Sequence, residues 1–255
     1  MKKKSLIICS SLLGITATAS ISMAEVNQPQ ELIMRPLTTP GGQITAGGDF
    51  LILIAPDPIG TSMGLALGGR YGVDDNIEVG ASYVFSLKEF EAKGDLGVEA
   101  AYRIMDGNLA VAADVATGYS LIGEAIEPLQ LGARVRFRLN DQLSIQSGGG
   151  QLSIALDGDP KPITLGLPVG VGYQASPQLF AFVTTELASI SISNSETVVF
   201  GADYIPLTAG AFFSPSNTMD VGASIGWFDL KEASDFLFIG RSEEHTSELQ
   251  SLTNL

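Results

Sequence analysis

The stretch NIEVGASYVF at residues 76–85 indicates the fold class, because its residues alternate strictly between two kinds. The odd-numbered residues from Ile77 to Phe85 are apolar, whereas the first three even-numbered residues within that run are Glu, Gly and Ser. A period of two residues is typical of a β-strand with two different faces. The stretch TMDVGASIGW at residues 218–227 is a near copy, and the alternation recurs throughout residues 43–240. Since no segment there has the period of a helix, we expect an all-β protein.

Short turn sequences divide the alternating runs into strands, and longer, more acidic connections lie between these turns. The turns are VDDN (73–76), MDGN (105–108), LND (139–141), SP (176–177) and SPSN (214–217). Counting one strand on each side of every turn predicts about twelve strands, with both chain ends on the tight-turn side. Shortly before each turn the sequence places an aromatic residue on the apolar face of its strand: Tyr71, Tyr102, Phe137, Tyr173 and Phe213.

Two all-β architectures fit this pattern, a soluble sandwich with an apolar interior and a membrane barrel with an apolar exterior. Composition favours the barrel, because 16% of the residues are charged, against about 25% in an average soluble domain. The second face also consists mostly of Gly, Ala and Ser. The aromatic residues match a belt at one membrane surface, and Trp227 is assigned to the belt at the other. We therefore predict a closed, antiparallel up-and-down transmembrane β-barrel of about twelve strands.

The start of the chain has the pattern of a signal peptide at residues 1–24. MKKK is followed by the apolar run LIICSSLLGITATA and by a small residue on each side of Met23, so we expect cleavage after Ala24. The alternative is an uncleaved anchor helix, although the run is shorter than the ~20 residues that span a bilayer. Residues 25–42 are then expected to form a periplasmic lead segment before the barrel at 43–240. No segment of the sequence is identified as a plug.

The end of the chain departs from the strand pattern. RSEEHTSELQS at residues 241–251 resembles a translated reading frame of a common sequencing adapter, and it follows directly on the strand-like run 236–240. We interpret residues 241–255 as an artefact tail, the alternative being a natural polar tail. On the first interpretation the native end of the last strand is missing.

Several functional classes are excluded. The formal net charge of -14 argues against nucleic acid as a partner, because phosphate binding needs a basic face. Cys9 lies in the signal peptide and the only histidine, His245, lies in the tail, so the barrel lacks the residue types of Cys/His metal sites. Glu99 and Asp114 could act as an acid–base pair, but no nucleophile or phosphate-binding loop accompanies them. We therefore predict no catalytic residues, metal or cofactor, and no enzyme activity.

The candidate functional residues are charged side chains that share the small-residue face. Arg134, Arg136 and Arg138 alternate with apolar residues, and facing lipid near the midplane would cost about 2–4 kcal/mol each, so they should face the lumen. With Arg70 and Arg103 they could form a basic track that guides anions. Alternatively, carboxylates on the same face pair with them and fill the barrel; these are Glu78, Glu99, Asp114 and Asp220.

Two hairpin sequences, RYGVDDNIEVGASY (70–83) and RFRLNDQLSI (136–145), carry a family resemblance. They resemble the hairpins of bacterial outer-membrane β-barrels, in particular the roughly twelve-stranded, transporter-like group labelled phenol-degradation-pathway (MetA-pathway) outer-membrane proteins. The resemblance covers residues 43–240. It implies export to the bacterial outer membrane, insertion by the barrel assembly machinery, and contact with outer-membrane lipids and lipopolysaccharide.

These observations give two functional hypotheses. The first is a channel or transporter that passes small solutes passively through a narrow charged lumen. The alternative is a non-conducting barrel with a role in structure or surface interaction. The arginines distinguish the two, because an unpaired track implies conduction, whereas a closed salt-bridge network implies a plug.

Overall fold

The computed structural model describes residues 28–54, 61–87, 94–158, 161–192, 198–200, 205–227, 229 and 237–248. The signal peptide predicted at residues 1–24 lies outside the described residues. In the described part, the longest helix is η1 (Leu32–Met34), a single 3₁₀ turn. No helix there is long and apolar enough to cross a bilayer.

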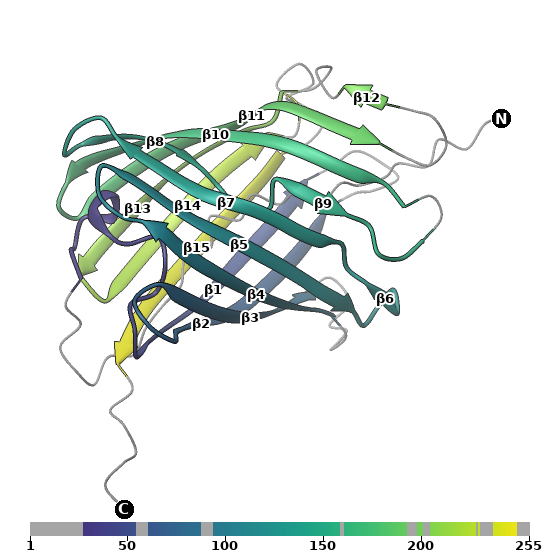
Figure 1. Ribbon diagram of the computed structural model, residues 1–255, viewed down its shortest axis with the longest axis horizontal. Helices are drawn as coiled ribbons and strands as arrows, with labels where there is room; N and C mark the ends of the chain where they lie inside the picture. Colours follow the sequence, from purple (N-terminus) through teal and green to yellow (C-terminus); the bar gives the residue numbers. More distant parts are fainter. Residues whose placement is uncertain are drawn as a thin grey trace, which may run out of the picture.

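A single antiparallel sheet curves round and closes on itself, as Figure 1 shows. Closure comes from β1, which pairs with β2 on one side and with β15 on the other, where Gln43 opposes Glu248 and Ile54 opposes Leu237. The wall has twelve positions: β1 (Gln43–Ile54), β2 (Ser62–Gly72), β3 (Ile77–Ser86), β4 (Gly94–Met105), β5 (Leu109–Ser120), β7 (Leu129–Arg138), β8 (Leu143–Ser147) continued by β9 (Leu152–Ile154), β10 (Ile163–Ser176), β11 (Leu179–Ile192), β13 (Leu207–Ser216), β14 (Met219–Trp227) and β15 (Leu237–Glu248). Two short strands, β6 (Ala125–Ile126) and β12 (Val198–Phe200), pair with β5 and β11. The predicted closed barrel of about twelve strands is confirmed.

The two faces of the wall follow the predicted alternation. Outward positions hold exposed apolar side chains, such as Leu67, Val98 and Leu187, while inward positions hold buried small or polar ones. The five tight turns also lie where the sequence places them. In the first, the Asp74 carboxylate accepts hydrogen bonds from the backbone N–H groups of Asn76 (2.7 Å) and Ile77 (2.8 Å), and such local bonds fix a turn without distant contacts.

The wall is interrupted between β8 and β9, where the glycine-rich stretch 148–151 leaves the ladder. The side chain of Gln151 replaces the missing backbone partner of β7. Its Oε1 accepts a bond from the N–H of Ala133, and its Nε2 donates to the carbonyl of the same residue, both at 2.7 Å. The side-chain amide of Gln151 therefore supplies hydrogen-bond partners for the backbone N–H and carbonyl groups of Ala133 at the gap, and backbone groups away from water need such partners.

The closing strand extends further than the sequence analysis predicts. The barrel was expected to end at Gly240, but β15 continues to Glu248, and its register sets Arg241 opposite Ala223 and Glu243 opposite Val221. Residues 241–248 of the suspected tail thus provide the last wall position, whereas residues 249–255 lie outside the described residues. The adapter origin of this segment stays a prediction.

The segment before β1 has a position that the sequence analysis does not specify. Residues 28–42, the described part of the expected lead segment, lie within the lumen at the tight-turn end, where Figure 1 shows the purple coil. Ile33 and Thr38 are 1% and 2% exposed, and the segment forms hydrogen bonds with β3, β7 and β10. This stretch, called the lumen segment from here on, is the plug-like element that no sequence signal identified.

Candidate functional site

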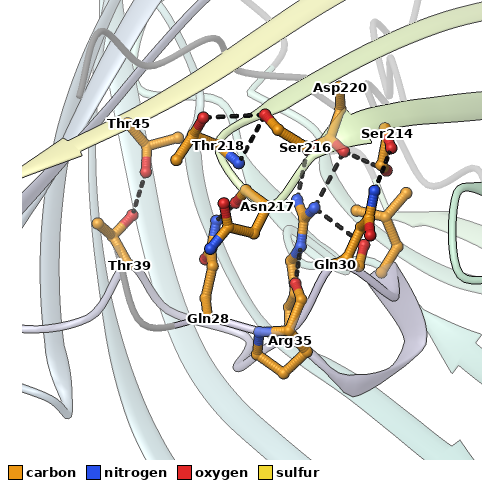
Figure 2. A network of polar contacts seen from close by, with 12 residues as sticks. Gln28, Gln30, Arg35, Thr39, Thr45, Ser214, Ser216, Asn217, Thr218 and Asp220 are labelled. Carbon is orange, nitrogen blue, oxygen red and sulfur yellow. Dashed lines mark hydrogen bonds and ion pairs between the residues drawn. The ribbon is translucent and has the colours of Figure 1, made fainter. Parts of the chain in front are cut away.

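The lumen segment is held to β13 and β14 by a set of polar contacts that Figure 2 shows. Arg35 forms an ion pair with Asp220 and donates a second bond, of 3.1 Å, to the same carboxylate. Asp220 also accepts a bond from the hydroxyl of Ser214. The side-chain amides of Gln28 and Gln30 donate to the backbone carbonyls of Asn217 (2.7 Å) and Ser214 (2.8 Å). This buried ion pair is satisfied by hydrogen bonds on both partners, as a stable buried pair requires.

On the opposite wall, four charged side chains form a closed network across β2, β3, β4 and β7. The guanidinium of Arg134 donates to Glu78 (2.8 Å) and to Glu99 (3.1 Å). Arg70 contacts the same two carboxylates, Glu99 at 2.5 Å and Glu78 at 3.7 Å. Thr39 of the lumen segment completes the network, because its N–H (2.6 Å) and hydroxyl (2.7 Å) both donate to Glu78.

Small residues make these contacts possible. Ala110 and Ala112 of β5 are fully buried, and their short side chains leave room for Arg134 to reach β4 across β5. Gly72, at the end of β2, allows the lumen segment to approach the wall, because a Cβ there would lie 2.0 Å from the carbonyl oxygen of Pro40. Only glycine permits so close a backbone approach.

Arg136 and Arg138 differ from Arg134, because no carboxylate pairs with them among the described residues. Arg136 is 8% exposed and donates to two backbone carbonyls of the lumen segment, those of Leu32 (3.2 Å) and Arg35. Arg138 contacts the sulfur of Met34 and the side-chain oxygen of Asn108. Two positive charges therefore lie where the lumen segment meets β7, with neutral partners only.

A cluster of aromatic side chains lies on β11 and β13. Phe180 and Phe182 of β11 and Phe212 of β13 are buried inside the barrel, and Ile33 of the lumen segment belongs to the same cluster. The rings of Phe182 and Phe212 are stacked, with centroids 5.6 Å apart. Each ring lies over a glycine of a neighbouring strand, where an added Cβ would approach to within 2.6 Å; these glycines are Gly172, Gly210 and Gly222. The result is an apolar patch in a lumen that is otherwise polar.

The remaining predicted site residues have varied surroundings. Arg103 faces inward but pairs with Asp106 of its own turn at 3.4 Å. Asp114 accepts a bond from the N–H of Gly150 (3.0 Å) and pairs with no arginine among the described residues, which corrects the expected pairing. The aromatic residues of the turn end are all exposed on the outer face, as their predicted position requires: Tyr71, Tyr102, Phe137, Tyr173 and Phe213. Trp227 lies at the other end of β14 and is half-buried.

Gln174 of β10 also belongs to the site, because its Oε1 accepts a hydrogen bond from the N–H of Ile33 at 3.2 Å. Several residues of the site were missed by the sequence analysis: Ile33, Arg35, Thr39, Gln174 and the three lumen phenylalanines. One signal for them exists in the sequence. Phe180 and Phe182 fall on the face that elsewhere holds Gly, Ala and Ser, and bulky aromatic groups on that face indicate that something apolar covers them. No comparable signal marks Arg35, because the segment before β1 has no period.

The groups at the site are charged and polar side chains together with an aromatic cluster. In the described part of the chain, no group of three or more His, Cys, Asp or Glu side chains could hold a metal ion. The polar groups are guanidinium, carboxylate, amide and hydroxyl groups in mutual contact. Arg136 and Arg138 place two guanidinium groups at the tight-turn end, where the turns also carry carboxylates such as that of Asp106.

Comparisons with known proteins give similarity in fold. No protein-family model and no curated protein matches the chain. The solved structure of the COG4313 outer membrane channel from Pseudomonas putida F1 superposes with a TM-score of 0.53 at 13% identity, over 82% of this chain and 97% of that one. The KdgM porin in complex with disordered oligogalacturonate gives a TM-score of 0.51 at 9% identity, over 79% of this chain and 98% of that one. This chain therefore has the fold of outer-membrane β-barrels.

Proposed function

We propose that this chain is a channel of the bacterial outer membrane that passes small solutes passively through its lumen. The exterior of the closed wall is apolar along its strands, and a closed barrel leaves no unpaired sheet edge in lipid. We further propose that residues 1–24 are removed during export and that the barrel assembly machinery inserts the chain. The aromatic residues of the turn end and Trp227 then form two belts in contact with outer-membrane lipids and lipopolysaccharide.

One observation supports passage of solutes rather than a purely structural role. Arg136 and Arg138 face the lumen with neutral partners, at the level where the lumen segment occupies part of the route. The Asp106 carboxylate interacts electrostatically with Arg136, but neither arginine has a carboxylate within ion-pair distance among the described residues. Positive charge at such a place lowers the electrostatic energy of an anion and raises that of a cation. We therefore propose a preference for anionic solutes.

A second function, a non-conducting barrel, is favoured by a different observation. The lumen segment contacts opposite sides of the wall, through Thr39 on one side and Arg35 on the other. The network of Arg70, Arg134, Glu78 and Glu99 is also closed, and a filled lumen of this kind serves structure or surface interaction.

Planar-bilayer recordings in a potassium chloride gradient separate these functions. We expect a small conductance for the refolded barrel, with a reversal potential on the anion side, and a larger one when residues 28–39 are deleted. Heat-modifiable migration on gels verifies that both proteins are folded. If both fold and insert, yet neither conducts above an empty bilayer, the channel is refuted and the structural function remains.

A further inference from the structure

We propose that the place now filled by Ile33 is a binding site for small apolar monocarboxylates, with Arg136 as the carboxylate-binding residue. This inference rests on the proposed channel function, since the solute must reach the lumen, and it adds the class of solute. The lumen segment itself shows the required chemistry. It presents a branched apolar side chain to the three phenylalanines and backbone carbonyl oxygens to the guanidinium of Arg136.

The polar half of the site has unused hydrogen-bonding capacity. Arg136 is bound by neutral carbonyls, and its Nε has no hydrogen-bond partner among the described residues. Ser144 of the adjacent strand β8 opposes Arg138, the next inward position along β7 from Arg136. It is 0% exposed, and its hydroxyl likewise has no partner there. A carboxylate would satisfy the guanidinium with two oxygens and supply the missing negative charge. It would therefore bind Arg136 more strongly than the carbonyls do.

The apolar half adjoins the polar half at Gly172 of β10. A Cβ at this position would lie 2.4 Å from the ring of Phe180 and 3.0 Å from the hydroxyl oxygen of Ser144. The aromatic ring and the free hydroxyl thus meet over one glycine. Because Ile33 covers this wall, a ligand with an apolar body of similar size would bury the same surface.

A ligand must compete with Ile33 of the lumen segment for the same place. This competition allows a test, because a merely structural role of these residues predicts no change in ligand affinity when Ile33 is shortened. A ligand's apparent affinity falls in proportion to the fraction of molecules whose site is open. Shortening Ile33 weakens the hold of the segment and enlarges that fraction. The Ile33→Ala variant should therefore bind the ligand at least about tenfold more tightly than the wild type.

Isothermal titration calorimetry of the refolded full barrel with 4-methylpentanoate tests the proposal. The neutral 4-methylpentanamide tests the need for charge, and acetate tests the need for an apolar body. We expect binding of 4-methylpentanoate at least tenfold tighter than that of either control. Equal binding of the amide, or equal binding of acetate, would refute the site as proposed.

Variants assign the binding to these residues. Arg136→Gln should weaken the binding of 4-methylpentanoate at least tenfold, and Ser144→Ala severalfold, whereas Lys161→Gln, which removes an exposed positive charge in the loop before β10, should leave it unchanged. If Arg136→Gln does not fold, Ser144→Ala and Ile33→Ala decide. An Ile33→Ala barrel that binds no tighter than the wild type refutes the inference. Conductance without carboxylate binding refutes only this site, whereas binding without conductance refutes only the channel.

Discussion

Arg136 contributes both a positive charge to the lumen and two hydrogen bonds to the lumen segment. Replacing it by alanine removes both contributions, so we expect a several-fold higher conductance and a reversal potential shifted toward cations. Bilayer recordings of Arg136→Ala beside the wild type measure this. Arg136→Lys keeps the charge and should stay closer to the wild-type selectivity. An unchanged reversal potential in a folded Arg136→Ala barrel would contradict the role of the charge.

Arg35 holds the lumen segment to β14 through a buried ion pair. Its removal leaves Asp220, which is 1% exposed, as an unpaired buried charge, and such a loss costs about 3–5 kcal/mol. We expect Arg35→Ala to lower the free energy of unfolding by this amount, measured by urea titration of the heat-modifiable gel shift. Arg103→Ala breaks a pair whose Asp106 is half exposed and should cost no more than about 1 kcal/mol. Equal losses would contradict this assignment.

For a single charged residue, the period of two residues predicts which face of the strand the side chain occupies, but not which residue forms an ion pair with it. It places Arg134, Glu78 and Glu99 correctly in the lumen, where they pair. The partner of Asp220 is instead Arg35, 185 residues away in the sequence, in a segment without any period. Pairing depends on what else fills the lumen, and the strand pattern contains no information about that.

The ring of Phe212 in β13 packs directly on Gly222 in the neighbouring strand β14. A Cβ at Gly222 would lie 2.4 Å from the ring of Phe212, so Gly222→Ala forces the ring away and should cost about 1–3 kcal/mol in urea unfolding. Gly68→Ala in β2 is the matched control, because its nearest neighbours lie at 3.5 Å, an ordinary contact. Adding Phe212→Leu to Gly222→Ala should recover part of the loss. Independent, additive effects of the two substitutions would contradict the contact.

The closing strand β15 has an unusual sequence for its register. The backbone register of β15 sets Arg241 and Glu243 opposite Ala223 and Val221, whereas the sequence RSEEHTSELQS has neither the alternation of the other strands nor an aromatic ending. We therefore predict that resequencing the gene replaces residues 241–255 with a few strand residues that end on an aromatic. A transcript that encodes the present tail would show that the adapter interpretation is wrong.

Strands and tight turns were predictable because their signals are local: alternation within a strand, and Asp, Asn, Gly and Pro within a turn. The break between β8 and β9 was not predictable from the sequence, because it depends on hydrogen bonds between the side chain of Gln151 and the backbone of Ala133 in β7. The lumen segment was missed for a similar reason, since its conformation is imposed by β3, β7, β10 and β14 rather than by its own residues.

The whole molecule should behave as an integral outer-membrane protein. Its wall closes on itself and its outer face is apolar, so the chain should fractionate with the outer membrane and migrate faster on gels when unheated. Fractionation and gel electrophoresis with and without boiling measure this, with a soluble periplasmic protein as the control. Recovery of the chain in the soluble periplasmic fraction would contradict the proposed location.

The contacts of the lumen segment also bear on the order of the folding steps. Thr39 bonds to β3, the N–H of Ile33 bonds to Gln174 of β10, and Arg35 pairs with β14. These partners come together only after the C-terminal strands have curved round to meet β1. We therefore expect the earliest residues of the described chain to complete their native contacts among the last steps of folding.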